Sequence, residues 1–200
     1  MQHFGQNLHL NTRVKDQNQP GEKDVTTLNE QNIITLCKKG DRSAQKALYD
    51  SLSPKMFSIC MRYMGDRESA EDVLQEGFIS LFSKLGSYSG EGSFEGWARK
   101  VFVNTALMTL RKNDILKQSA DIENAFGVTS GAASAIQNIS YKELLKAISE
   151  LPTGYRTVFN MFAIEGYSHK EISDALGITE ATSRSQLQRA RVMLQNKIKR

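Results

Sequence analysis

One stretch near the middle of the chain constrains the fold more than any other, because it sets two amphipathic helices on either side of a glycine-bearing loop. Between residues 70 and 85, apolar side chains recur every three or four positions, which is the spacing of one buried helix face. Residues 86–96 carry four glycines and are expected to form the loop. A second apolar stripe runs from Phe94 to Met108. The stretch predicts an all-α protein.

Helical periodicity also covers the region before this stretch. It starts near Asn29 and stops at a glycine just before Asp41, which is expected to cap the next helix. Pro54 is predicted either to interrupt that helix or to open its next turn, and Gly65 is expected to end it. Residues 1–28 are polar, rich in Gln and Asn and without a sustained period, so they are predicted to form a disordered tail.

A change of composition divides the chain into two small helical domains. Residues 114–139 are rich in Ser, Ala, Gly and Asn, with few large apolar side chains, and are predicted to be a flexible linker. The domains on either side of it are expected at residues 29–113 and 140–200.

The second domain has the order of a helix-turn-helix. Ser and Glu stand three residues apart at Ser140–Glu143 and again at Ser168–Glu171, and each pair is expected to form a capping box. The second box opens a short helix that ends at Gly177, and a long basic helix starts at Thr179. This arrangement is typical of DNA-binding domains.

A helical wheel separates two faces of the long basic helix. The inward face is predicted to hold Ser183, Leu187, Ala190, Leu194 and Ile198. The outward face holds side chains of the types that read base edges, with Arg184 on its flank: Ala181, Ser185, Gln188 and Arg189. Arg191 and the basic residues after it are expected to hold phosphates.

Charge is unevenly distributed although the net charge is only +4. Residues 66–96 hold seven acids and two bases, whereas residues 97–117 hold five bases and one acid. Residues 180–200 hold six bases and one acid. This segregation predicts one surface for a basic protein partner and two surfaces for phosphates.

Other kinds of site have little support in the sequence. Cys37 and Cys60 lie inside apolar helical patterns and are expected to be reduced and buried. The three histidines, His3, His9 and His169, are scattered, so no metal site, cofactor or catalytic residue is predicted. No apolar run is long enough to span a membrane, and the expectation is a soluble, cytoplasmic protein without membrane insertion.

Several motifs together resemble the extracytoplasmic-function (ECF) group of bacterial sigma factors, which are promoter-specificity subunits of RNA polymerase. The resemblance runs from about Ile33 to Leu194, and in general character the chain resembles the branch of the family that is common in Bacteroidetes. The motifs, in chain order, are GDRSAQKALYD, RYMGDRESAEDVLQEGF, GSFEGWARKVFVNTALMTLRK, ELPTGYRTVF and GYSHKEISDALGITEATSRSQLQRAR.

The resemblance implies three sets of contacts and a further partner. The DVLQE helix of the family docks on the clamp helices of core RNA polymerase, which points to Asp72, Gln75 and Glu76. The following loop and helix open the −10 element, which points to Tyr88, Ser89, Gly90, Phe94, Trp97, Arg99, Lys100 and Asn104. The last domain binds the −35 element and touches the polymerase flap, which points to Ala181, Arg184, Ser185, Gln188, Arg189 and Arg191. An anti-sigma factor is the further partner implied.

Three positions depart from the family pattern, and two other kinds of protein stay open as alternatives. Phe102 stands where a small residue is frequent, Met108 where Asp is usual, and Gln186 where Arg or Lys is frequent. The main alternative is a helix-turn-helix regulator that acts without replacing the sigma subunit, and its N-terminal domain would dimerise or sense a ligand. A small helical enzyme is the weaker alternative, since no acid pair with His and no phosphate-binding loop is found.

Overall fold

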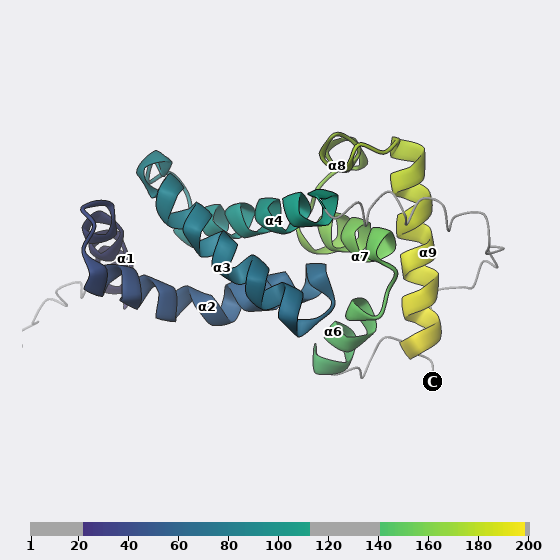
Figure 1. Cartoon of the computed structure of the whole chain (residues 1–200), viewed down its shortest axis with the longest axis horizontal. Coiled ribbons are helices and arrows are strands. Elements are labelled where there is room, and N and C mark those ends of the chain that lie inside the picture. The colour runs from purple at the N-terminus through teal and green to yellow at the C-terminus, as the bar shows by residue number, and fades with distance from the viewer. Residues whose placement is uncertain (1–21, 113–140, 199–200) are drawn as a thin grey trace, which may run out of the picture.

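The structure, a computed structural model, describes residues 22–112 and 141–198, and all regular structure in these ranges is helical (Figure 1). The first group of helices comprises α1 (Glu22–Lys38), α2 (Arg42–Met64), α3 (Arg67–Lys84), the short 3-10 helix η1 (Leu85–Ser87) and α4 (Phe94–Lys112). The second comprises α6 (Tyr141–Ser149), α7 (Thr153–Phe159), the π-helical turn η3 (Asn160–Ile164), α8 (His169–Leu176) and α9 (Glu180–Ile198). The prediction of an all-α fold in two helical domains is confirmed.

Most helix ends lie where the sequence places them. Asp41 Oδ1 accepts the backbone N–H of Ala44 at 2.7 Å, and Gly65 ends α2 with a φ of 86°. Pro54 does not interrupt α2, which runs unbroken through it. The proline itself is exposed, while Leu52 and Met56 on either side are buried, so tertiary packing holds the helix together across the missing N–H.

The first helix starts earlier than the sequence indicates. Helix α1 begins at Glu22, inside the segment 1–28 that was predicted to be tail, because its first turns lack the apolar stripe by which a helix is recognised. The predicted disorder of residues 1–21 and the predicted linker at 114–139 lie outside the described residues. So does Ser140, and with it the first of the two capping boxes.

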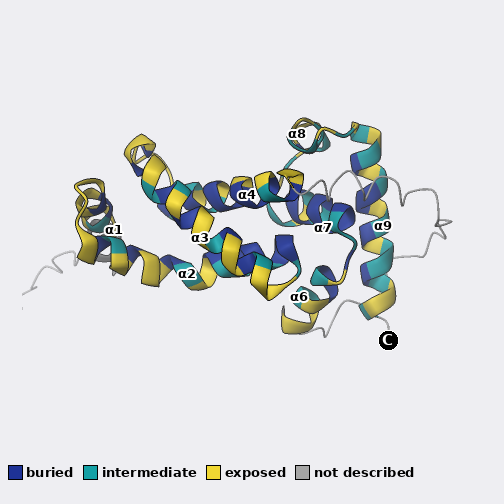
Figure 2. Cartoon of the chain, in the orientation of Figure 1, coloured by how far each residue is buried: buried dark blue, intermediate teal, exposed yellow. Residues whose placement is uncertain are grey.

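Helices α2, α3 and α4 pack around the main core, which Figure 2 shows as the dark-blue faces turned toward one another. Tyr63 and Phe102 are fully buried there. The ring of Phe102 lies against Gly77, which has no side chain to obstruct it. The larger residue at position 102, one of the three departures from the family pattern, is therefore accommodated by the glycine that faces it.

The second group of helices has a smaller core of its own and also packs on the first group. Helices α6, α7 and α9 enclose Ile148, Leu151 and Tyr155. Val158 of α7 and Met161 of η3, by contrast, belong to the same apolar cluster as the side chains of α2 to α4. The two groups thus form one elongated body in which α7 lies beside the end of α2 (Figure 1).

Both cysteines are buried and unpaired, as expected, and burial raises the pKa of Cys60 to about 12. Among the described residues, no group of three or more His, Cys, Asp or Glu side chains is placed to hold a metal ion. In the same ranges, no helix combines the length and the apolar character needed to cross a membrane.

Candidate functional site

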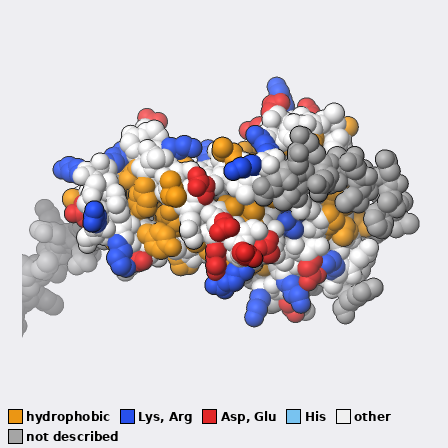
Figure 3. Space-filling view, viewed as in Figure 1, with side chains coloured by type: hydrophobic (Ala, Val, Ile, Leu, Met, Phe, Trp, Pro, Cys, Tyr) orange, Lys and Arg blue, Asp and Glu red, His pale blue; other side chains and the backbone are white. Residues whose placement is uncertain are grey.

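Helix α3 presents an acidic face to solvent. Asp72, Gln75 and Glu76 are all exposed and lie on one side, opposite buried residues such as Ala70 and Leu81. Figure 3 shows acidic side chains gathered over α3 with hydrophobic side chains beside them. Within the described part of the chain neither Asp72 nor Glu76 forms an ion pair, so their charges are available to a partner.

Ile79 extends this face and was missed by the sequence reasoning. It is 63% exposed and lies one helical turn after Gln75 and Glu76. The sequence did carry a signal, because Ile79 is the one large apolar residue of α3 outside the apolar stripe. An exposed apolar side chain beside unpaired acids is an arrangement found at protein interfaces.

The loop before α4 is held by three aromatic rings. Tyr88 is 6% exposed, and its hydroxyl donates to the carbonyl of Gly92 at 2.9 Å. Its ring packs against Phe94 and Trp97 at centroid distances of 5.1 and 5.4 Å. Phe94 is buried as well, whereas Trp97 is partly exposed. Tyr88 and Phe94 therefore shape the loop from inside, and of the three rings Trp97 is the one open to a ligand.

Exposed residues follow Tyr88 in the loop and recur along α4. Ser89 and Gly90 are exposed in the loop, and Gly90 has a φ of 86°, which favours glycine. Lys100 and Asn104 are exposed one turn apart on α4, and Met108 continues their row at 66% exposure. The departure at Met108 thus puts an apolar group on the same face as these two residues.

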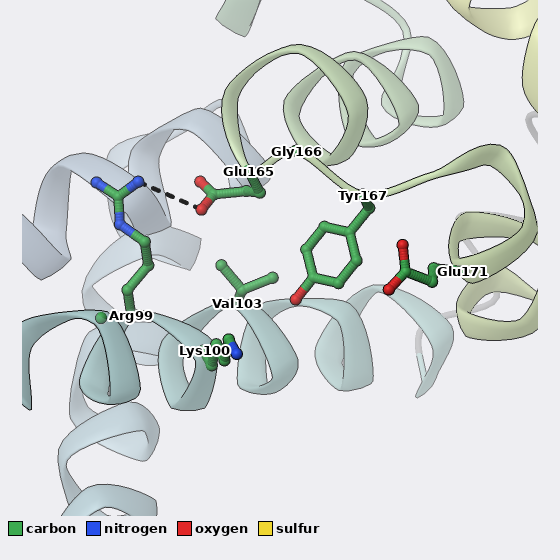
Figure 4. A pocket seen from close by; sticks show the side chains of 8 residues that line it. Arg99, Lys100, Val103, Glu165, Gly166, Tyr167 and Glu171 are labelled. Carbon is green, nitrogen blue, oxygen red and sulfur yellow. Dashed lines mark hydrogen bonds and ion pairs between the residues drawn. The ribbon is translucent and has the colours of Figure 1, made fainter. Parts of the chain in front are cut away.

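Among the three polar residues of α4 expected at the −10 element, Arg99 differs from Lys100 and Asn104 in that its guanidinium pairs with another part of the chain. Its Nη1 donates to the carboxylate of Glu165 at 3.4 Å, and the side chain is 41% exposed. The two residues line a pocket of about 360 Å³, together with Lys100, Tyr167 and Glu171 (Figure 4). Glu165 is 66 positions away in the chain, and no local sequence pattern points to it.

Side-chain hydrogen bonds fix the geometry of the helix-turn-helix. The predicted capping box at Ser168–Glu171 is present, and Gly177 has the expected left-handed backbone, with a φ of 67°. Thr179 Oγ1 accepts the N–H of Thr182 at 3.0 Å, which caps α9. His169 Nδ1 lies 2.9 Å from Ser183 Oγ, so the first residue of α8 is tied to the buried face of α9.

The exposed face of α9 carries most of the predicted reading residues. Ser183, Leu187, Ala190 and Leu194 are buried as the helical wheel predicts. Successive turns of the opposite face expose Ala181, Arg184, Gln188 and Arg191, with Ser185 half-buried beside them. Gln186 is buried, so the departure at this position lies inside the protein and not on the face.

Arg189 is oriented differently from the expectation that it points away from the protein. Its Nη1 donates to the hydroxyl of Tyr155 at 3.2 Å, and its Nε is buried without a hydrogen-bond partner among the described residues. The wheel could not show this, because Tyr155 belongs to α7 and contacts α9 only after folding. A guanidinium with a buried unpaired donor is a group that can exchange its partner for a better acceptor.

The comparisons with known proteins agree with this division into two parts. The family model described as "Sigma-70 region 2" matches residues 48–115, and the model described as "Sigma-70, region 4" matches residues 141–194. Region 2 therefore takes in the acidic face, the aromatic loop and α4, and region 4 takes in the helix-turn-helix.

Curated relatives cover nearly the whole chain. The ECF RNA polymerase sigma-E factor of Haemophilus influenzae is 28% identical over 182 residues, which are 86% of this chain and 96% of the relative. The protein of the same description from Escherichia coli K12 is also 28% identical, over 86% of this chain and 95% of its own.

Among solved structures, the sigma factor RpoE of Bartonella quintana, crystallised with the anti-sigma factor NepR, is 19% identical with a TM-score of 0.46. It covers 77% of this chain, and the match takes in 96% of its own chain.

Two models of one family, in chain order, together match more than half of the sequence. The chain therefore belongs to the sigma-70 family as an ECF sigma factor, a subunit without catalytic chemistry of its own that directs RNA polymerase to promoters.

Proposed function

We propose that three separate surfaces of this sigma factor divide its task. The acidic face of α3 docks on the clamp helices of core RNA polymerase, the loop and α4 hold the opened −10 element, and α9 reads the −35 element. The domain limits proposed are 29–113 and 140–200, with α1 extending the first domain back to Glu22. The observation that carries the proposal is that the acids of α3 and the reading residues of α9 are exposed on different helices.

The docking surface combines charge with an apolar contact. Asp72 and Glu76 form no ion pair with any described residue, and Ile79 adds exposed apolar area on the same face. Tyr49 is 41% exposed and its ring contacts that of Phe78, with the centroids 4.4 Å apart, so it lies next to α3 and enlarges that area. Acids steer a basic partner, and the apolar side chains contribute most of the affinity.

At the −10 element we assign three parts of the protein to the opened strand: an aromatic ring, the backbone of the loop, and polar and basic side chains of α4. Extruding a base from the stack costs a few kcal/mol. Stacking it on an aromatic side chain returns about 1–3 kcal/mol. Trp97 is the ring proposed for this contact, while Tyr88 and Phe94 support it, and Ser89 and Gly90 leave room for the sugar and phosphate. Arg99, Lys100 and Asn104 are assigned to the displaced strand, whose phosphates they neutralise or bond.

At the −35 element we assign the exposed row of α9 to the major groove. Arg184 and Gln188 are long enough to reach base edges, Ala181 and Ser185 allow close approach, and Arg191 is assigned to a phosphate. Arg189 joins them when it leaves the hydroxyl of Tyr155 for a stronger acceptor on DNA.

Two further proposals rest on the resemblance of the motifs. An anti-sigma factor is the proposed regulatory partner, and the branch common in Bacteroidetes is the proposed lineage. The proposed place of action is the cytoplasm, because RNA polymerase and the chromosome are found there.

Transcription by core RNA polymerase from genomic promoter fragments, with and without the purified protein, tests the proposal. Initiation at a discrete set of sites only when both are present is the expected result, and mapping the 5′ ends gives the −10 and −35 sequences. Binding of the protein to palindromic DNA without any redirection of polymerase would instead favour a regulator that acts without replacing the sigma subunit.

A further inference from the structure

A buried carboxylate joins the two domains of this sigma factor. Glu165 follows η3 in region 4, and its side chain is only 4% exposed. Oε1 accepts from Arg62 Nη2 at 2.8 Å, and Oε2 accepts from Arg99 Nη1 at 3.4 Å. Both arginines belong to region 2, on α2 and α4, so this single acid bridges two helices of the other domain.

Hydrogen bonds next to this bridge cap the end of α2 from region 4. The last carbonyls of a helix have no partner inside it. Here Arg156 donates to the carbonyls of Tyr63 and Met64 at 3.0 and 2.7 Å, and Asn160 Nδ2 donates to the carbonyl of Arg62 at 2.7 Å. Region 4 is therefore held against region 2 by directed contacts and not by apolar packing alone.

The same seam contains polar atoms that closure leaves unsatisfied. Arg62 Nε, the hydroxyl of Tyr63 and Asn160 Oδ1 are buried without a hydrogen-bond partner among the described residues. Buried polar groups without partners destabilise the state that buries them. Separation of the domains would expose these atoms to water, where they can form hydrogen bonds. The unsatisfied atoms therefore reduce the stability of the closed state relative to the open one.

Closure also pairs one of the cations that the proposed function assigns to DNA and places carboxylates near the other. Arg99 is paired with Glu165, and Lys100 lines the same pocket as Glu165 and Glu171 (Figure 4). Hydrogen bonds from Ser168 lower the pKa of Glu171, and the nearby charge of Lys100 adds to that lowering. Two carboxylates thus stand beside the two cations, where the phosphates of the −10 strand would lie. Guanidinium groups bind carboxylate and phosphate in the same geometry.

We propose that Glu165 forms an autoinhibitory contact, in which region 4 folds onto α4 and competes with the −10 strand for Arg99 and Lys100. The inference rests on the proposed role of α4 in strand binding. Opening of the domains at Glu165 is then required before the −10 strand can bind. The apparent affinity for that strand is the affinity of the open form multiplied by the fraction of molecules that are open.

The test compares Glu165→Gln with Glu150→Gln in the full chain. Both variants remove one negative charge from the second group of helices, but the ion pair of Glu150 is with Lys197 of α9, in that same group. Dyes on Lys39→Cys and Asn196→Cys, both exposed, report the distance between the domains by energy transfer, while Cys37 and Cys60 are buried. The DNA probe is a labelled single strand with the non-template −10 sequence of a promoter mapped by the transcription experiment.

Glu165→Gln is expected to lower energy transfer and to tighten binding of the single strand by about 3- to 10-fold. Glu150→Gln should change neither quantity. If Glu165→Gln does not fold, Asn160→Leu replaces it, because this variant removes the hydrogen bond to the Arg62 carbonyl and leaves Glu165 in place.

Two results would overturn the proposal. Equal behaviour of Glu165→Gln and Glu150→Gln shows that the contact does not control opening. Lower energy transfer without tighter binding shows that closure does not inhibit. Arg99→Ala, added to Glu165→Gln so that the inhibitory contact is already removed, separates these results from a failure of the proposed function. If this double variant binds the strand as tightly as Glu165→Gln alone, Arg99 does not contact the strand, and the contact with Glu165 cannot inhibit strand binding through it.

Discussion

Gly77 of α3 and Phe102 of α4 are matched so closely that a β-carbon at residue 77 would lie 2.3 Å from the Phe102 ring. Phe102 is fully buried and also meets Phe78 edge-on at 5.1 Å, so the ring has no room to withdraw. The contact fixes the spacing of the two helices that carry the proposed docking face and the proposed strand-binding residues.

Gly77→Ala is therefore expected to destabilise the protein by about 1–3 kcal/mol. Gly86→Ala is the control, because a β-carbon there meets nothing within 4 Å. The double variant Gly77→Ala/Phe102→Leu should lose less stability than the sum of its two single variants, since a smaller side chain relieves the overlap. Urea denaturation of the four proteins measures this, and strict additivity would contradict it.

Asp72→Asn combined with Glu76→Gln should weaken competition for core RNA polymerase by about tenfold or more while leaving the fold intact. Glu150→Gln combined with Asp174→Asn is the control, because it also removes two negative charges, from exposed residues that lie outside α3. The measurement is displacement of a labelled sigma factor from core enzyme. If both double variants lose the same affinity, general charge and not the proposed face accounts for docking.

Arg184→Ala and Gln188→Ala should each weaken binding to the −35 element by about 1–3 kcal/mol and relax base preference at one position. Lys39→Ala, which removes the same charge as Arg184→Ala from an exposed site in the first domain, should have little effect. Binding is measured by fluorescence anisotropy with matched and mutated −35 duplexes. Loss of polymerase docking in the Arg184 variant would show that the two surfaces are not separate.

The helix-turn-helix should lose stability when the pH falls from 7.5 to 5.5. Burial lowers the pKa of His169 below 6.5, and the positive charge of Arg184 adds to this effect. The unfolded chain then binds more protons than the folded one as the pH falls through 6.5, so the stability due to neutral His169 is complete above that pH and declines below it.

His169→Gln removes this titration, and its melting temperature should change less between the two pH values than that of the unchanged chain. Glu171 does not interfere, because its pKa is lowered from 4.5 and it titrates below the range used. Equal pH dependence in the two proteins would show that His169 is not responsible.

Local signals in the sequence were sufficient for the helices, their caps and the buried face of α9. Asp41, Gly65 and the Ser168–Glu171 box are recognisable because a cap depends on residues close together in the chain. The burial of Tyr88 and the contact of Arg189 with Tyr155 depend on rings and helices that meet only after folding. Glu165 could not be predicted for the same reason, since its two arginines are 66 and 103 positions away.

The acidic face of α3 is open in the same structure in which the guanidinium of Arg99 is paired with Glu165. Under the roles proposed for these residues, assembly follows an order: the closed chain can meet polymerase before it can meet the −10 strand. Opening then takes place on the enzyme, where the two DNA-binding parts can be spread to match a promoter. Free molecules of the protein would consequently leave promoters unoccupied until polymerase arrives.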